Sequence, residues 1–235
     1  MKVVVAVPYR ADGGWRDELW DWCRPHWEQV GEVVEGFQHD DGPFSRAACI
    51  NRALNDESWD VAVIVDADTL APLSRVQAAV HWHLTPTRLL LPYRQRLLLS
   101  ESYTRRLLAD EAESPAMSAK AAALSLQHAT PEPYKAFRSG VVVVHRQLWE
   151  EVRGYDDRFV GWSAEDDAFA DACEALGAGP PARLDGDIWH LWHPSAKPPS
   201  DDPNYLANQA LHRRYRRARK SERSMRAMID ERFAP

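Results

Sequence analysis

The sequence predicts an α/β fold in which a mainly parallel sheet is flanked by helices and followed by a C-terminal helix. Short runs of β-branched and apolar residues alternate with stretches of helical periodicity, which is typical of such a sheet. The 235 residues are 45% hydrophobic, enough for one large domain with a buried core. Three cysteines at wide spacings indicate neither a disulfide framework nor a cysteine zinc cluster.

The first half of the chain has the clearest order. Buried strands are expected at 2–7, 32–37 and 61–65, with helices at 15–29 and about 44–56 between them. A candidate ligand-binding segment lies at the end of each of these strands. These segments are Pro8-Tyr9-Arg10, His39-Asp40-Asp41 and Asp66-Ala67-Asp68. Because ligands of parallel sheets bind beyond the carboxyl ends of the strands, we expect a binding site at this edge.

The second half is less regular, and Pro131 and Pro133 interrupt it. The remaining predicted elements are a strand at 89–91, helical segments from about 97 to 127, a buried strand at 141–144 with a short helix after it, a strand-like segment at 182–189, and one long helix at 204–230. The Pro-rich stretch at 195–203 predicts an extended link. We therefore expect a main domain over 1–195, and a Pro-rich link with a basic C-terminal helix over 196–235.

Charge is distributed unevenly along the chain. The net charge is -6, but residues 212–226 hold eight Lys or Arg and one Glu, a charge of +7, and residues 227–235 carry -1, which leaves -12 on residues 1–211. Such a basic helix is suited to an anionic partner such as nucleic acid, and equally to pairing with the acidic body. With no apolar run of about 18 residues and no cleavable signal pattern, we expect a soluble cytoplasmic protein without a membrane span.

Asp66 and Asp68 form the first candidate site. They follow a buried strand, and since alternate residues share a face, both carboxylates can approach one ligand. This arrangement suits a divalent cation that bridges to a diphosphate, with Asp68 as the metal ligand and Asp66 contacting ribose or sugar. Asp-rich turns also cap the following helix, and this alternative stays open.

A second acidic group, Glu165-Asp166-Asp167, follows Gly161-Trp162 and begins a helix with a clear buried face. Acids at a helix start are favoured by the helix dipole. Ser163 with Asp166 also fits a capping box. Capping explains one acid well, but it does not explain three acids behind a Gly-Trp turn.

These motifs, together with Val7-Pro8-Tyr9-Arg10, Pro43-Phe44-Ser45-Arg46-Ala47 and Pro133-Tyr134 leading to Gly140, resemble the inverting, metal-dependent glycosyltransferases of the GT-A fold, especially the β-1,4-galactosyltransferase-like group in a bacterial or phage form. The resemblance covers roughly residues 3–193 in order. It implies the GT-A fold and a uridine-diphospho-sugar donor. The residues that it assigns to nucleotide-sugar binding are Pro8, Tyr9, Arg10, Phe44, Arg46, Asp66, Tyr134, Gly140 and Trp162.

The resemblance also implies a catalytic pair and a metal. Asp166 corresponds to the base that takes the proton of the acceptor hydroxyl, and Glu165 to the acid that holds a sugar hydroxyl. His193 matches a family metal ligand, while His190 stands where the family has Met. With Asp68, these imidazoles suit Mn²⁺ or another divalent cation better than Mg²⁺. Two satisfied structural histidines are the alternative.

The chain departs from the family at two positions. Ser139 and the pair Ser163-Ala164 replace glycines, so added side chains alter the donor-sugar pocket and leave the sugar open. The chief alternative is a nucleotide-sugar or carbohydrate-binding module without turnover, against which Asp166 argues. A zinc hydrolase would need a third clear ligand at short spacing. A nucleotidyltransferase would need a richer Gly loop than Ala11-Asp12-Gly13-Gly14.

Overall fold

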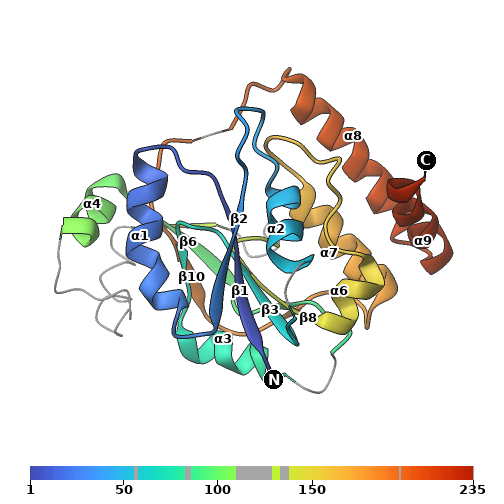
Figure 1. The fold of residues 1–235 in the computed structure, drawn as a ribbon, viewed down its shortest axis with the longest axis horizontal. Helices are drawn as coiled ribbons and strands as arrows, with labels where there is room; N and C mark the ends of the chain where they lie inside the picture. The colour runs from blue at the N-terminus through green and yellow to red at the C-terminus, as the bar shows by residue number, and fades with distance from the viewer. Residues whose placement is uncertain (56–57, 83–85, 110–128, 133–137, 196, 235) are drawn as a thin grey trace.

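The computed structural model of residues 1–235 describes the whole chain except 56–57, 83–85, 110–128, 133–137, 196 and 235. It contains a six-stranded sheet in the order β2-β1-β3-β8-β5-β9 and a four-stranded sheet in the order β4-β10-β6-β7, with helices packed around them (Figure 1). The strands are β1 (Val3–Tyr9), β2 (Glu32–Phe37), β3 (Val61–Val65), β4 (Thr69–Leu70), β5 (Leu90–Leu91), β6 (Gln95–Leu99), β7 (Ala129–Glu132), β8 (Val141–His145), β9 (Ala182–Arg183) and β10 (Asp187–His190). The helices are α1 (Trp15–Trp27), α2 (Arg46–Asn55), α3 (Leu73–Val80), α4 (Glu101–Ala109), α6 (Arg146–Val152), α7 (Glu165–Leu176), α8 (Pro203–Ala218), α9 (Glu222–Asp230) and the 3-10 turn η2 (Glu231–Phe233).

The six-stranded sheet is mainly parallel, as predicted. Among its described strands only β8 runs antiparallel to its neighbours, β3 and β5. Every residue of β3 and β8 is buried. Strands covered on both faces read as unbroken Val and Ile runs rather than alternating patterns, which is why both were visible in the sequence. Because β1, β2 and β3 are parallel, the loops after Tyr9, Phe37 and Val65 leave the sheet at one edge.

The start of the stretch predicted to be helical, from about residue 97, lies in a strand instead. Gln95–Leu99 forms β6, which pairs with β10 and β7. Its buried positions alternate along the end of the strand, a period that the Leu-rich composition masked. Pro131 lies inside β7 opposite Leu97, and a proline is tolerated there because β7 is an outer strand. The rest of the expected helical stretch is described only as α4, and Tyr134 also lies outside the described residues.

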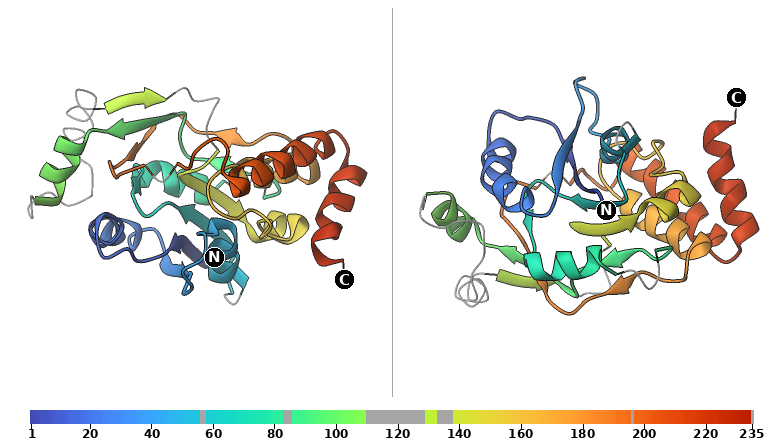
Figure 2. Two further views of the ribbon diagram at one scale, coloured as in Figure 1. Left: turned by 90° about the horizontal axis from the view of Figure 1, so that it is seen from above. Right: turned by 60° about the horizontal axis from the view of Figure 1, so that its bottom comes forward.

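The single long C-terminal helix that the sequence predicts is wrong. The chain breaks after α8, and Ser221 caps a new helix by accepting a hydrogen bond from the Ser224 amide at 3.4 Å. α9 then turns back and buries Met225, Met228 and Ile229. A straight helix would carry these three side chains away from the body into water, so the break is favoured by apolar burial. Figure 2 shows α8 and α9 at the end of the molecule opposite α4.

None of the described helices is both long enough and apolar enough to cross a membrane.

Candidate active site

Asp68, His190 and His193 form a compact group, called here the metal group. One ligand atom from each side chain lies within 4.8 Å of the others. The Asp68 carboxylate is 3.5 Å from His190 Nε2 and 3.1 Å from His193 Nε2. Strand pairing explains the approach: β10 runs antiparallel to β4, with His190 opposite Thr69, and the Leu191 amide donates to the Asp68 carbonyl at 2.8 Å. One carboxylate and two imidazoles are a donor set that fits a divalent transition metal.

The orientation of the His193 ring leaves a ligand atom available. Its Nδ1 lies 2.8 Å from the carbonyl oxygen of Pro194, which can only accept, so Nδ1–H donates there and Nε2 is the ring atom directed at Asp68, 3.1 Å away. The hydrogen bond that protonated Nε2 donates to the Asp68 carboxylate raises the pKa of His193, so a metal bound at Nε2 would displace this proton. Burial opposes the ionisation of Asp68, yet His190 and His193 hold its pKa below the ordinary value. A cation at this group would therefore compete with a proton, and its affinity would fall as pH falls.

Arg46 is the centre of a second group, the acid cluster, which also contains Asp66, Glu165 and Asp166. Arg46 Nε and Nη2 donate to Asp66 Oδ1 at 2.9 and 2.7 Å, and Nη1 donates to Asp166 Oδ1. Glu165 Oε1 lies 3.9 Å from the same Nη1. The four side chains are between 12% and 23% exposed. One guanidinium therefore faces three carboxylates in a region with little water.

The imbalance of charge in the acid cluster perturbs its titration. Burial raises the pKa of Asp166 to about 8; Arg46 opposes the shift, and the negative charges of Glu165 and Asp66 add to it. Burial also raises the pKa of Glu165. A single cation cannot offset three poorly hydrated carboxylates, so the cluster holds on to a proton. A carboxyl group that titrates near neutral pH is suited to accept a proton from a hydroxyl group.

Tyr155 also belongs to the site, although the sequence suggests only a turn residue there. Its hydroxyl donates to Asp166 Oδ1 at 3.1 Å. Its ring is 1% exposed and stacks on Phe169 with centroids 4.1 Å apart. Asn51 holds its main chain: the Asn51 side chain accepts from the Tyr155 amide and donates to the Tyr155 carbonyl, both at 2.9 Å. The one sequence signal was an aromatic residue with a polar tip in the Gly154-Tyr155-Asp156 turn that follows the short helix α6.

The start of α7 differs from the predicted capping box. Ala164 is the N-cap and no side chain caps the helix; Ser163 Oγ accepts instead from Gln209 Nε2 at 2.8 Å. Ser163 and Ala164 have φ values of 101° and 77°, in the left-handed region that favours glycine. Asp166 does not take part in a capping box, and its carboxylate accepts from Arg46 instead. The left-handed backbone at Ser163 and Ala164 is strained, and contacts such as the one from Gln209 to Ser163 maintain it.

The end of β1 carries three of the predicted nucleotide-sugar residues. Pro8 and Tyr9 are buried, and the Tyr9 hydroxyl donates to Asp17, so this ring supports the strand end from within. Arg10 lies at the surface, with its guanidinium 5.4 Å from the centroid of the Phe44 ring. Arg10 and Phe44 thus form one half-exposed cation–π pair at the edge of the sheet.

Gly140 and Trp162 reach the same edge through backbone contacts. The Gly140 carbonyl accepts from the Asp66 amide at 3.0 Å, and its φ of 86° requires glycine. The Gly161 amide donates to the carbonyl of Phe44 at 2.9 Å, which ties the loop before α7 to the loop before α2. Trp162 follows and is 44% exposed, an aromatic face open to solvent.

A cavity of about 110 Å³ lies beside the metal group. It is lined by Asp12, Trp15, Arg16, Leu19, Ala67, Asp68, His193 and Pro194. Trp15 forms the aromatic side of the cavity, and two contacts hold its ring in place. It packs edge-on against Trp192 with centroids 5.1 Å apart, and the Arg105 guanidinium lies 4.4 Å from the centroid of the Trp15 ring. The structure thus places an aromatic and cationic recess next to Asp68.

Comparison with known proteins bears on the fold. A family model described as the N-terminal domain of galactosyltransferase matches residues 121–179. A search of curated proteins gave no match. A crystal structure of GalNAc-T7 with UDP, GalNAc and Mn²⁺ aligns over 99% of this chain with a TM-score of 0.53 and 11% identity. That alignment confirms the predicted GT-A fold.

Other solved structures are similar at lower TM-scores. The catalytic domain of Drosophila β-1,4-galactosyltransferase 7, in complex with xylobiose, is 18% identical over 77% of this chain, with a TM-score of 0.47. A mannosyltransferase from Pyrobaculum calidifontis, with GDP-Man and Mn²⁺, is 16% identical over 97% of this chain, also with a TM-score of 0.47. The chain covers 64% of the Drosophila structure, 68% of the Pyrobaculum structure and 55% of GalNAc-T7.

Proposed function

We propose that the protein is an inverting, metal-dependent glycosyltransferase that moves a hexose from a uridine-diphospho-sugar to an acceptor hydroxyl. The observation that carries the proposal is Asp166, a partly buried carboxyl group of raised pKa that shares Arg46 with Asp66, two residues before Asp68 of the metal group. The family model and the nucleotide-sugar enzymes among the similar structures support it. The bacterial or phage origin and the cytoplasmic location stay predictions from the sequence.

The chain's own residues fit a single displacement. Asp166 takes the proton from the acceptor hydroxyl as that oxygen forms a bond to the anomeric carbon; the bond from this carbon to the diphosphate breaks, and its electron pair leaves on UDP. Arg46 and Tyr155 hold Asp166 in place, and Glu165 holds a sugar hydroxyl. Attack opposite the leaving group inverts the anomeric carbon.

Asp68 and His193, with His190, would hold Mn²⁺ or another divalent cation. When bound, the cation supplies positive charge for the departing diphosphate. Tyr9, Arg10 and Phe44 mark the strand edge proposed for uridine. Trp162 offers its exposed ring to a sugar face, whose C–H groups suit an aromatic surface.

Donor turnover tests the proposal directly. A panel of UDP-hexoses with Mn²⁺ is expected to reveal at least one donor that the protein hydrolyses slowly in water and transfers to a suitable hydroxyl. Product anomers read by NMR should be inverted relative to the donor. Tight donor binding with no turnover for any donor or acceptor would instead support the alternative of a non-catalytic nucleotide-sugar-binding module.

Metal removal gives a further prediction. Calorimetry with UDP-hexose is expected to show binding with Mn²⁺ and at least about tenfold weaker binding in EDTA, because the diphosphate loses its cation. Changing His193 to Ala should weaken Mn²⁺ binding, read by EPR, by about 10–100-fold. His81→Ala is the matched control, because His81 is an exposed histidine at the C-cap of α3. Equal donor affinity with and without metal would remove the metal from the proposal.

The acceptor is proposed to be nucleic acid, of which hydroxylated phage DNA is an example, engaged by the outer face of α8. Arg213 and Arg217 on α8 and Lys220, two residues after its end, are exposed and form no ion pair with any described residue. Changing all three to Gln is expected to raise the acceptor KM and reduce the salt dependence of binding, with donor hydrolysis unchanged. Arg75→Gln on α3 is the control. An unchanged KM and salt slope would point to a protein or glycan acceptor.

A further inference from the structure

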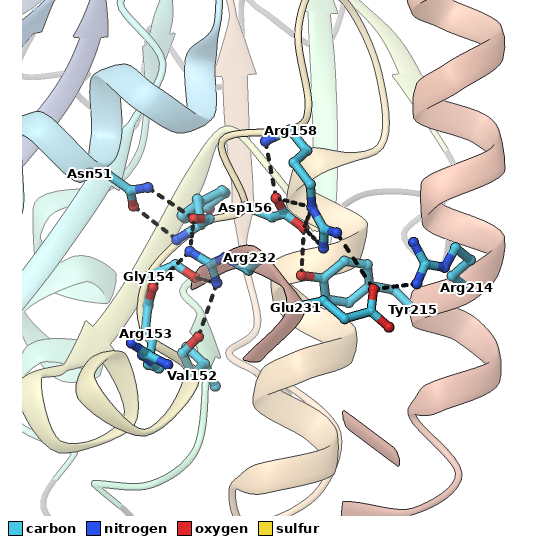
Figure 3. Close-up of polar contacts among 11 residues, drawn as sticks. Asn51, Val152, Arg153, Gly154, Asp156, Arg158, Arg214, Tyr215, Glu231 and Arg232 are labelled. Atoms are coloured by element: carbon cyan, nitrogen blue, oxygen red, sulfur yellow. Dashed lines mark hydrogen bonds and ion pairs between the residues drawn. The ribbon is translucent and has the colours of Figure 1, made fainter. Parts of the chain in front are cut away.

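Arg232, in the 3-10 turn η2, binds the turn that carries Tyr155, and Tyr155 in turn contacts Asp166 of the acid cluster. Helix α6 ends with Arg153 and Gly154 in left-handed conformations, with φ of 58° and 69°. The last carbonyls of a helix have no partner within the helix and need one elsewhere. Here the Arg232 side chain, from the 3-10 turn η2, donates to the carbonyls of Val152, Arg153, Gly154 and Tyr155. Figure 3 shows Arg232 directed into this turn.

Arg232 and Asn51 both bind the main chain of Tyr155. The Tyr155 carbonyl accepts from both side chains, and the Tyr155 amide donates to Asn51. Gly154 packs too closely against Asn51 to carry a side chain, since a Cβ there would lie 2.7 Å from Asn51 Oδ1. The backbone that carries the Tyr155 ring is therefore clamped between α2 and the C-terminal turn. The hydroxyl of that ring donates to Asp166.

The C-terminal turn is itself firmly attached. Glu231 pairs with Arg214 and lies 3.7 Å from Arg158 Nη1. Arg158 also pairs with the buried Asp156, which accepts from the Tyr215 hydroxyl at 2.8 Å. These contacts join η2, α8 and the loop after Tyr155 into one network (Figure 3). Arg232 thus acts from a fixed support rather than from a loose tail.

We propose that Arg232 is a positioning residue for the candidate active site, which holds the Tyr155 hydroxyl against Asp166 from the last turn of the chain. The proposal rests on the proposed function for its kinetic consequences, but the clamp itself can be tested without turnover. The groups that face Asp166 are Arg46 from α2, Asp66 from the end of β3, Glu165 from α7 and Tyr155 from the turn after α6. Only the last of these depends on Arg232.

The kinetic test compares Arg232→Ala with Tyr155→Phe in the full-length protein. Both are expected to lower kcat about tenfold, the scale of one lost hydrogen bond in the site, with donor KM within about twofold. Both should also shift the acid limb of the kcat–pH profile to higher pH, because the Tyr155 hydroxyl that stabilises the ionised Asp166 carboxylate is lost or displaced. The double variant should lose no more than either single variant. Arg226→Ala, whose partners are the surface residues Glu151 and Glu222, is the control and should match the parent.

Hydrogen exchange separates the clamp from the activity. The amides of residues 154–156 are expected to exchange faster in Arg232→Ala than in the parent or in Arg226→Ala. If no donor is turned over by the parent, the proposed function fails, and this measurement still decides the clamp. Should Arg232→Ala unfold, Arg232→Lys is used, since one ammonium cannot bind four carbonyls in the geometry of the planar guanidinium. Parent-like exchange, kcat and pH limb in whichever arginine variant folds would overturn the proposal.

Discussion

Replacing Asp166 with Asn is expected to reduce sugar transfer by about 10²–10⁴-fold, with the fold and donor affinity retained, because an amide cannot accept the acceptor's proton. The substitution keeps the size of the side chain, and its amide oxygen can still accept from Arg46 and Tyr155. Transfer rates at saturating donor, with calorimetry for donor affinity, measure the effect. Asp167→Asn is the matched control, since the neighbouring Asp167 is 41% exposed and lies 3.8 Å from Arg138 rather than from Arg46.

The pH profile of the parent supplies the second half of this prediction. The base must be ionised to act, and the pKa of Asp166 is raised to about 8. Transfer should therefore increase as pH rises through about 8, and this acid limb should disappear in Asp166→Asn. Transfer by Asp166→Asn within a few-fold of the parent would show that another group is the base, and Glu165 is the nearest candidate.

Replacing Arg46 with Leu is expected to destabilise the protein by about 3–5 kcal/mol at pH 8, since it leaves buried carboxylates without their cation. The loss should depend on pH. Because the pKa of Asp166 is raised from 3.8 to about 8, the folded protein binds more protons than the unfolded chain between about pH 4 and 8, and stability falls as pH rises. Loss of Arg46 raises the pKa of Asp166 further, because its positive charge opposes the shift. The destabilisation should therefore be largest at pH 8 and smallest near pH 5.

Urea unfolding at both pH values measures this effect. Arg52→Leu is the control, because Arg52 is exposed on the same helix. Adding Asp166→Asn to Arg46→Leu should recover part of the lost stability at pH 8, since one buried charge is removed. An equal loss at pH 5 and pH 8 would mean that Arg46 contributes through packing rather than through the three carboxylates.

The sheet and its ligand-binding edge were predictable because their signals are local. A strand covered on both faces is an unbroken apolar run, and Asp66 and Asp68 mark where β3 leaves the core. The end of β1 was predicted two residues too early, since Pro8 and Tyr9 belong to the strand and are buried. β6 was missed because five residues of a Leu-rich stretch do not distinguish a strand from a helix. The partners that make it a strand, β10 and β7, are separated from it in sequence and only pair in the folded chain.

The sequence by itself determined the α/β class, the burial of the central strands and the position of Asp66 and Asp68 at a strand end. It also placed Glu165 and Asp166 at a helix start, which the structure confirms, whereas the alternative of a Ser163 capping box is wrong. Each of these depends on residues close together in the chain, where periodicity and turn chemistry are decisive.

Only the tertiary structure decided which of these groups face one another. Arg46 meets Asp166 across 120 positions of sequence, and Arg232 meets Tyr155 across 77. No periodicity encodes such a pair, since each contact depends on how whole helices and strands pack. The resemblance assigns Arg46 to nucleotide-sugar binding, and the folded protein shows in addition that Arg46 pairs with Asp66 and Asp166. The predicted single C-terminal helix is divided in two because α9 buries its apolar face.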